Sequence, residues 1–167
     1  PNMGYKSLTL SVKWSLQIFI VMAILTNNTS AKLSNEIENK EIISALKKVY
    51  GARAEKRGNA WIKILTQSKA LSEVDKLKKV NKFFNLFRFV DDITLWGVKN
   101  YWATPVEFIG ASGGDCEDYS IAKYYTLLQL GVPDEKMRIT MVKALKLNQY
   151  HMVLAYYDTP GSIPLIL

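Results

Sequence analysis

The pattern of apolar and polar positions sets the first thirty residues apart from the rest. Lys6 and Lys13 precede an almost uninterrupted apolar run over residues 14–25, and small or polar residues follow up to Ala31. This layout is typical of a secretory signal peptide. The run is shorter than the roughly 20 apolar residues that span a bilayer. We therefore expect a signal peptide over residues 1–31 and export to the periplasm, with an uncleaved signal anchor as the alternative.

Helical spacing of apolar positions begins soon after this segment. It predicts one amphipathic helix that ends before Gly51 and a second helix around residues 61–65. Ser72 and Asp75 have the spacing of a capping box. Apolar residues then recur every three to four positions as far as Phe87, which predicts a third helix.

Two further helices flank a glycine-rich loop. The run Thr104-Pro105-Val106-Glu107 places a capping residue, a proline and a glutamate at the positions that start a short helix. The loop over residues 110–114 follows, where the backbone can approach another group closely. The next helix is predicted to begin after the capping residue Asp115 and to end at Gly131. Cys116 then lies in its first turn.

The periodicity changes at Arg138. Three short apolar runs follow, over residues 139–145, 150–157 and 163–167, and polar turns separate them. Such runs predict an antiparallel meander. The fold class is therefore α+β, a helical N-terminal part with a small antiparallel sheet, in one domain over residues 32–167.

The amino-acid composition adds little to this interpretation. The chain has 167 residues, of which 49% are hydrophobic, and a formal net charge of +7. Its Lys and Arg residues are scattered through amphipathic segments, as expected for solvated helix faces. Export would also separate the protein from cytosolic nucleic acid. We therefore expect no nucleic-acid partner.

The candidate chemistry depends on one cysteine and one histidine, the only residues of their kinds in the chain. A helix N-terminus favours the thiolate of Cys116, and its free N–H groups can donate to an oxyanion. His151, on the second predicted strand, is the one imidazole that could act as general base. Gly113 and Gly114 would leave space for a substrate backbone. The alternative is an inert, buried cysteine.

Three acidic residues surround this cysteine: Asp115, Glu117 and Asp118. Like charges raise the pKa of a thiol and oppose the effect of the helix dipole. Asp115 and Asp118 could merely cap the helix. Three carboxylates beside a nucleophile are better explained by a cation, and an oxygen-only ligand set suits Ca²⁺. Calcium is therefore the expected cofactor.

The motifs resemble those of a known family. The run GGDCEDYSIAKY over residues 113–124, with YWATP at 101–105 and HMVL at 151–154, is similar to the bacterial transglutaminase-like cysteine proteinases. The resemblance extends over most of the chain from about Asn35 onward. It implies a papain- or transglutaminase-like fold.

The resemblance also implies an activity and its residues. It makes the protein a Cys-His-Asp thiol protease with Cys116 as nucleophile and His151 as base. It implies calcium dependence, with Asp115, Glu117 and Asp118 near the metal.

Further implications concern substrate and partners. In the family, the substrate is the N-terminal region of a large surface adhesin, cut within a short motif that contains two alanines. Cleavage releases the adhesin and disperses the biofilm. A LapD-like inner-membrane receptor, controlled by cyclic-di-GMP, sequesters the protease.

The third member of the triad departs from this pattern. The family's orienting Asp follows the third strand, so it is expected just past Leu167, and the domain is expected to be truncated at its C-terminus. Asp158 is the alternative orienting residue within the sequence.

Other functions stay open at this point. Trp102 could line the substrate cleft or belong to the core. The same thiol chemistry would serve a cell-wall hydrolase or a transglutaminase. A non-catalytic, calcium-dependent binding module with an inert Cys116 is the alternative from another class.

Overall fold

The structure, a computed structural model, describes residues 34–146 and 148–167. The signal peptide expected over residues 1–31 lies outside the described residues. The chain divides into two compact units between Glu41 and Ile42. In the first unit the described residues, 34–41, are helical. Among the described residues, no helix is long and apolar enough to cross a membrane.

The second unit begins with helical residues 42–50, which stop at Gly51, where φ is +84°. Helix α2 (Ala52–Gln67) follows and runs through Gly58 without interruption. The side chain of Leu46 occupies the space that a Cβ of Gly58 would need, so the glycine allows the two helices to pack closely. Helix α3 (Glu73–Phe84) starts as predicted, because Ser72 Oγ accepts a hydrogen bond from Asp75 N at 3.2 Å.

The middle of the chain contains short elements that the sequence pattern does not predict. Strand β1 (Arg88–Phe89) pairs in parallel with strand β2 (Gly113–Gly114), and helix α4 (Asp92–Leu95) lies between them in the sequence. The predicted capping box of Thr104 and Glu107 is present at the start of α5 (Pro105–Ala111).

Gly110 belongs to α5 and not to a loop. The ring of Tyr50 occupies the space that a side chain at position 110 would need. The helix ends at Ser112, whose φ of +65° is left-handed. The expected flexible loop over residues 110–114 is therefore a helix end followed by a buried strand.

The C-terminal part is the predicted antiparallel sheet. After helix α6 (Cys116–Gln129) and the short 3₁₀ helix η1 (Asp134–Lys136), the strands are β3 (Met137–Ala144), β4 (Gln149–Tyr156) and β5 (Leu165–Ile166). Their order is β3-β4-β5, and β4 pairs with both neighbours. The α+β prediction is confirmed.

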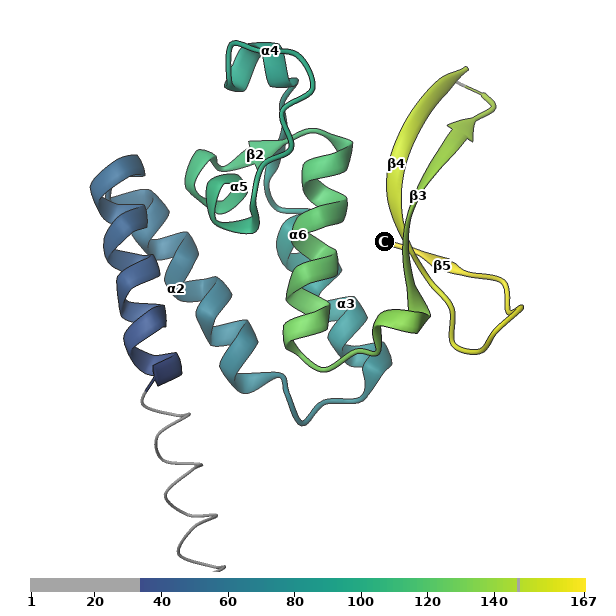
Figure 1. Cartoon of the computed structure of the whole chain (residues 1–167), viewed down its shortest axis with the longest axis horizontal. Helices are drawn as coiled ribbons and strands as arrows, with labels where there is room; N and C mark the ends of the chain where they lie inside the picture. The colour runs from purple at the N-terminus through teal and green to yellow at the C-terminus, as the bar shows by residue number, and fades with distance from the viewer. Residues whose placement is uncertain (1–33, 147) are drawn as a thin grey trace, which may run out of the picture. The chain divides into compact units, whose positions relative to one another are not determined.

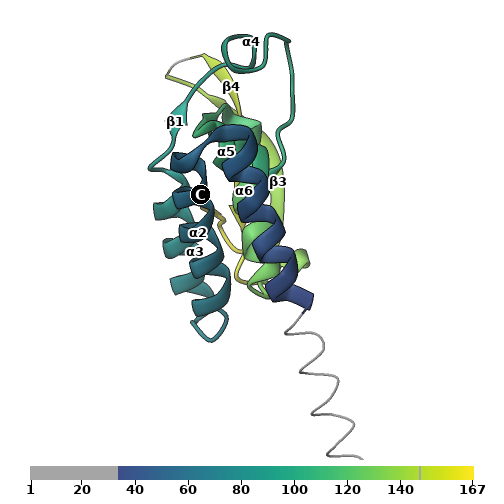
Figure 2. The same cartoon turned by 90° about the vertical axis from the view of Figure 1, so that its left-hand side faces the viewer.

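Helix α6 is the central element of this unit. It packs against α3 and α5 on one side and against β3 and β4 on the other (Figure 1). The two views agree that α5 lies beside α6 (Figure 2), and the rings of Phe108 and Tyr119 join them edge to face with centroids 4.8 Å apart. The first turn of α6 is thereby held between the helices and the sheet.

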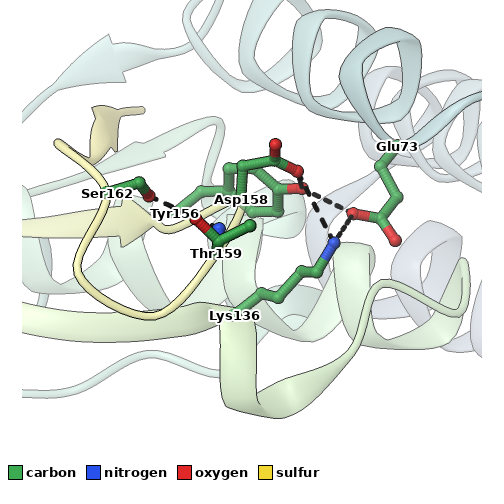
Figure 3. Close-up of polar contacts among 6 residues, drawn as sticks. All are labelled: Glu73, Lys136, Tyr156, Asp158, Thr159 and Ser162. Atoms are coloured by element: carbon green, nitrogen blue, oxygen red, sulfur yellow. Dashed lines mark hydrogen bonds and ion pairs between the residues drawn. The ribbon is translucent and has the colours of Figure 1, made fainter.

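A polar network ties the sheet to α3 (Figure 3). Lys136 Nζ donates to Glu73 Oε2 at 2.8 Å, and the Tyr156 hydroxyl donates to the same oxygen. Asp158 Oδ1 lies 3.7 Å from Lys136 Nζ. The hydrogen bonds from Lys136 and Tyr156 hold the pKa of Glu73 below its ordinary value.

This network predicts a pH-dependent contribution to stability. A carboxylate whose pKa is lowered by folding stabilises the protein above its unfolded pKa, and the contribution disappears as the pH falls through the folded pKa. Glu73→Gln should therefore lower the free energy of unfolding by about 1 kcal/mol at pH 7 and by much less at pH 3. Urea unfolding at both pH values measures this.

Glu36→Gln is the matched control, because its ion pair with Lys40 is exposed on both sides. It should change the free energy of unfolding little at either pH. An equal effect of Glu73→Gln at pH 3 and pH 7 would contradict the electrostatic explanation.

Candidate active site

Cys116 is the first residue of α6, as predicted, and Asp115 is the N-cap. The strand pair β1–β2 fixes the approach to this helix, since Val90 N donates to Gly114 O at 3.0 Å. In the first helical turn, the backbone N–H of Asp118 donates to the Asp115 side chain in a capping box. The N–H groups of Cys116 and Glu117 have no partners within the helix and are therefore available to an anion beside Cys116.

Cys116 and His151 line the same pocket, whose volume is about 370 Å³. The cysteine comes from α6 and the histidine from β4, opposite Val142 of β3. Both residues are partly exposed. The packing of α6 against β4 thus brings together the one thiol and the one imidazole of the chain.

The thiol of Cys116 is held as a neutral donor by its surroundings. Its Sγ donates to Glu117 Oε2 at 3.0 Å. Burial raises the pKa of the Cys116 thiol, while a hydrogen bond from the Met152 backbone acts in the opposite direction. The negative charges of Glu117 and Asp115 raise this pKa further. A cation beside these carboxylates would therefore favour the thiolate.

Three carboxylates meet next to Cys116. Oxygen atoms of Asp92, Asp115 and Glu117 all lie within 4.8 Å of one another. Oδ1 of Asp92 and Oδ1 of Asp115 are buried and accept no hydrogen bond among the described residues. Burial, followed by the charge of Glu117, raises the pKa of Asp115 to about 7. Convergent oxygens without donors are the arrangement that a hard divalent cation requires.

Asp92 is the residue that sequence reasoning missed. It is buried at the start of α4, where its Oδ2 accepts a hydrogen bond from Tyr101 N at 2.6 Å. The sequence shows only a polar pair, Asp91 and Asp92, between apolar segments. An acidic residue in a short turn can be buried, and this was the only indication that the sequence offered for Asp92. The pairing of β1 with β2, which brings Asp92 to α6, leaves no pattern in the sequence.

Asp118 occupies a different position from the one expected for a metal ligand. It is fully buried, and its two oxygens accept hydrogen bonds from Ala103 N at 2.7 Å and Asp115 N at 3.4 Å. Burial raises the pKa of Asp118 to about 6, although these two hydrogen bonds act to lower it. The structure places Asp92, and not Asp118, in the carboxylate cluster. Asp118 instead holds the backbone around the helix start.

The three residues expected to contact substrate lie outside the pocket lining. Gly113 and Gly114 are buried, and the space where side chains would stand is taken by the Arg88 carbonyl and by Asp118. Their small size therefore serves the packing of β2. Trp102 is 59% exposed, so a core role is excluded, and contact with substrate stays a prediction.

No carboxylate orients His151 within the described part of the chain. Asp158, the alternative orienting residue, lies beyond the end of β4 and points to Lys136 and Tyr156 (Figure 3). It takes part in the network with Glu73 and not in the pocket. The structure thus places Cys116 and His151, the predicted nucleophile and base, in one pocket, with a carboxylate cluster next to Cys116.

Comparisons with known proteins find a matching family and similar solved structures. The family described as bacterial transglutaminase-like cysteine proteinase matches residues 50–165. The solved structure of Legionella pneumophila LapG is 43% identical, with a TM-score of 0.68 over 77% of this chain and 71% of that one. An EGTA-treated form of the same protein gives the same identity and TM-score over 77% and 69%. A calcium-bound form is 45% identical, with a TM-score of 0.66 over 75% and 70%. The comparison with curated proteins found no match.

Proposed function

This chain belongs to the bacterial transglutaminase-like cysteine proteinases, and we propose that it is a calcium-dependent endopeptidase of the periplasm that cleaves a large surface adhesin near its N-terminus. The observation that carries the proposal is the shared pocket of Cys116 and His151, together with a carboxylate cluster that contacts Cys116 through Glu117.

The residues of the cluster fit a calcium ion. Asp92, Asp115 and Glu117 supply oxygens only, as Ca²⁺ prefers, and two of these oxygens are buried without a hydrogen-bond donor. The calcium-bound form of the Legionella protein supports this assignment. When Ca²⁺ is bound, its charge offsets that of the carboxylates and so lowers the pKa of the neighbouring thiol.

The chain's own residues then perform acyl transfer. His151 accepts the proton of Cys116, and the sulfur attacks the carbonyl carbon of the scissile peptide. The N–H groups of the first turn of α6 stabilise the oxyanion. As the C–N bond breaks, His151 returns the proton to the leaving amine. Water, deprotonated by the same imidazole, hydrolyses the thioester and restores the thiol.

The biological setting is proposed from the family resemblance. The adhesin would be cut within a short motif that contains two alanines, which would release it from the cell surface and disperse the biofilm. Export would depend on the apolar segment within residues 1–31. A LapD-like receptor of the inner membrane, controlled by cyclic-di-GMP, would sequester the protease. Cell fractionation tests the location, and co-purification with such a receptor tests the partner.

The decisive experiment incubates the protein with N-terminal adhesin fragments, with Ca²⁺ or with a chelator. We expect one cleavage within the alanine motif in Ca²⁺ and almost none in the chelator. A fragment in which the two alanines are replaced by bulky residues is the matched control. Equal cleavage with and without Ca²⁺ would contradict calcium dependence, whereas absence of cleavage in Ca²⁺ would contradict the adhesin as substrate.

A further inference from the structure

The pocket contains a buried cation that the steps above do not use. Lys123 lies on α6, seven residues after Cys116, and lines the same pocket. It is only 4% exposed. Residues spaced by three or four positions share one helix face, so Cys116, Ser120 and Lys123 follow one another along the pocket.

Lys123 has no anionic partner among residues 34–146 and 148–167. Within the described residues it forms no hydrogen bond and no ion pair; its ammonium lies over the ring of Tyr119, with Nζ 5.6 Å from the ring centroid. The part of the chain that the structure describes contributes no acidic side chain to the pocket lining. Lys136 differs from Lys123 in this respect, because its ammonium is paired with the carboxylate of Glu73.

A buried ammonium without a counter-ion destabilises the free protein. Desolvation lowers the pKa of Lys123 to about 8, so the side chain is still mostly protonated at pH 7. An anion that entered the pocket would meet a cation already stripped of water, and the resulting hydrogen bond would be strong. The end of the pocket at Lys123 should therefore bind a negatively charged group.

We propose that Lys123 is a specificity-determining residue that binds an acidic side chain of the substrate close to the scissile bond. The inference rests on the proposed peptidase function. Seven residues of helix span about 10 Å, and an extended peptide covers about 3.3 Å per residue. Helical side chains lean toward the N-terminus, which brings the ammonium nearer to Cys116. The acidic residue therefore lies within about three positions of the scissile bond.

The test compares synthetic peptides that differ at one position. Peptides that carry the cleavage motif receive Asp, Asn or Lys at each of the three positions before and after the scissile bond, and kcat/KM is measured in Ca²⁺. At one position the Asp peptide should exceed the Asn peptide by about tenfold, mainly through KM, and the Lys peptide should be poorer than both. This comparison needs only the wild-type protein.

Two variants assign the preference to Lys123. Lys123→Met keeps the length of the side chain and removes its charge, so the Asp to Asn ratio should fall to about 1. Lys123→Arg should retain part of the ratio. Lys76→Met is the matched control, because Lys76 is also buried but lies outside the pocket; its ratio should equal that of the wild type. No Asp preference in the wild type, or one that persists in Lys123→Met, overturns the proposal.

A second readout separates this proposal from the peptidase function. Iodoacetate and iodoacetamide alkylate the same thiol, and only iodoacetate carries a carboxylate. The ratio of their rates with Cys116 should fall several-fold in Lys123→Met and not in Lys76→Met. If the wild type cleaves no peptide, the peptidase function fails, and this ratio alone decides the role of Lys123: a fall supports it and an unchanged ratio overturns it.

Discussion

Cys116→Ala should eliminate peptide cleavage, with a loss of about a millionfold by analogy with removal of the nucleophile from serine triads. The variant keeps the pocket, His151 and the N–H groups of α6, but no atom can form the acyl intermediate. Cleavage of the adhesin fragment in Ca²⁺, followed by mass spectrometry of the products, measures the loss.

The control for this variant is its folding. Cys116 is only partly buried, and its thiol interacts with polar groups at two points, as donor to Glu117 and as acceptor from the Met152 backbone. The substitution should therefore change the unfolding temperature little and should leave calcium binding in place. Cleavage by Cys116→Ala at a rate near that of the wild type would assign the activity to another residue and would end the thiol mechanism.

The sequence predicted those parts of the fold that local chemistry determines. The caps at Ser72 and Thr104 start their helices as expected. Such a cap depends only on a side-chain oxygen and a backbone N–H three residues later, so it can be predicted from a short stretch of sequence. The sheet was predicted from short apolar runs that polar turns separate. The pair β1–β2 was missed, since two residues carry no periodicity and the partners are far apart in the sequence.

For the candidate site too, the sequence predicted what local features determine and missed what depends on distant contacts. Cys116 and His151 were found because each is the only residue of its kind, and the structure places both in one pocket. Asp118 was grouped with the metal ligands because it is near Cys116 in the sequence. Its side chain points instead to Ala103 N, and Asp92 arrives from a distant turn. Sequence proximity on a helix does not determine which carboxylates converge.

Asp92→Asn should weaken calcium binding by about tenfold to a hundredfold. The amide keeps one oxygen, which can still accept the hydrogen bond from Tyr101 N, but the cluster loses a negative charge and a ligand oxygen. Since a ligand stabilises the state that binds it, Ca²⁺ should also raise the unfolding temperature of the wild type more than that of the variant. Calorimetric titration and thermal unfolding measure both effects without any substrate.

Asp91→Asn provides the matched control for this prediction. Asp91 is the adjacent residue, is exposed, and is absent from the carboxylate cluster, so the substitution removes the same charge from the same turn. It should leave calcium affinity close to that of the wild type, because an exposed charge is screened by water and salt. If both variants weakened binding equally, the effect would come from the overall charge. If neither did, Ca²⁺ would bind without Asp92, and the assignment of the cluster as the metal site would be wrong.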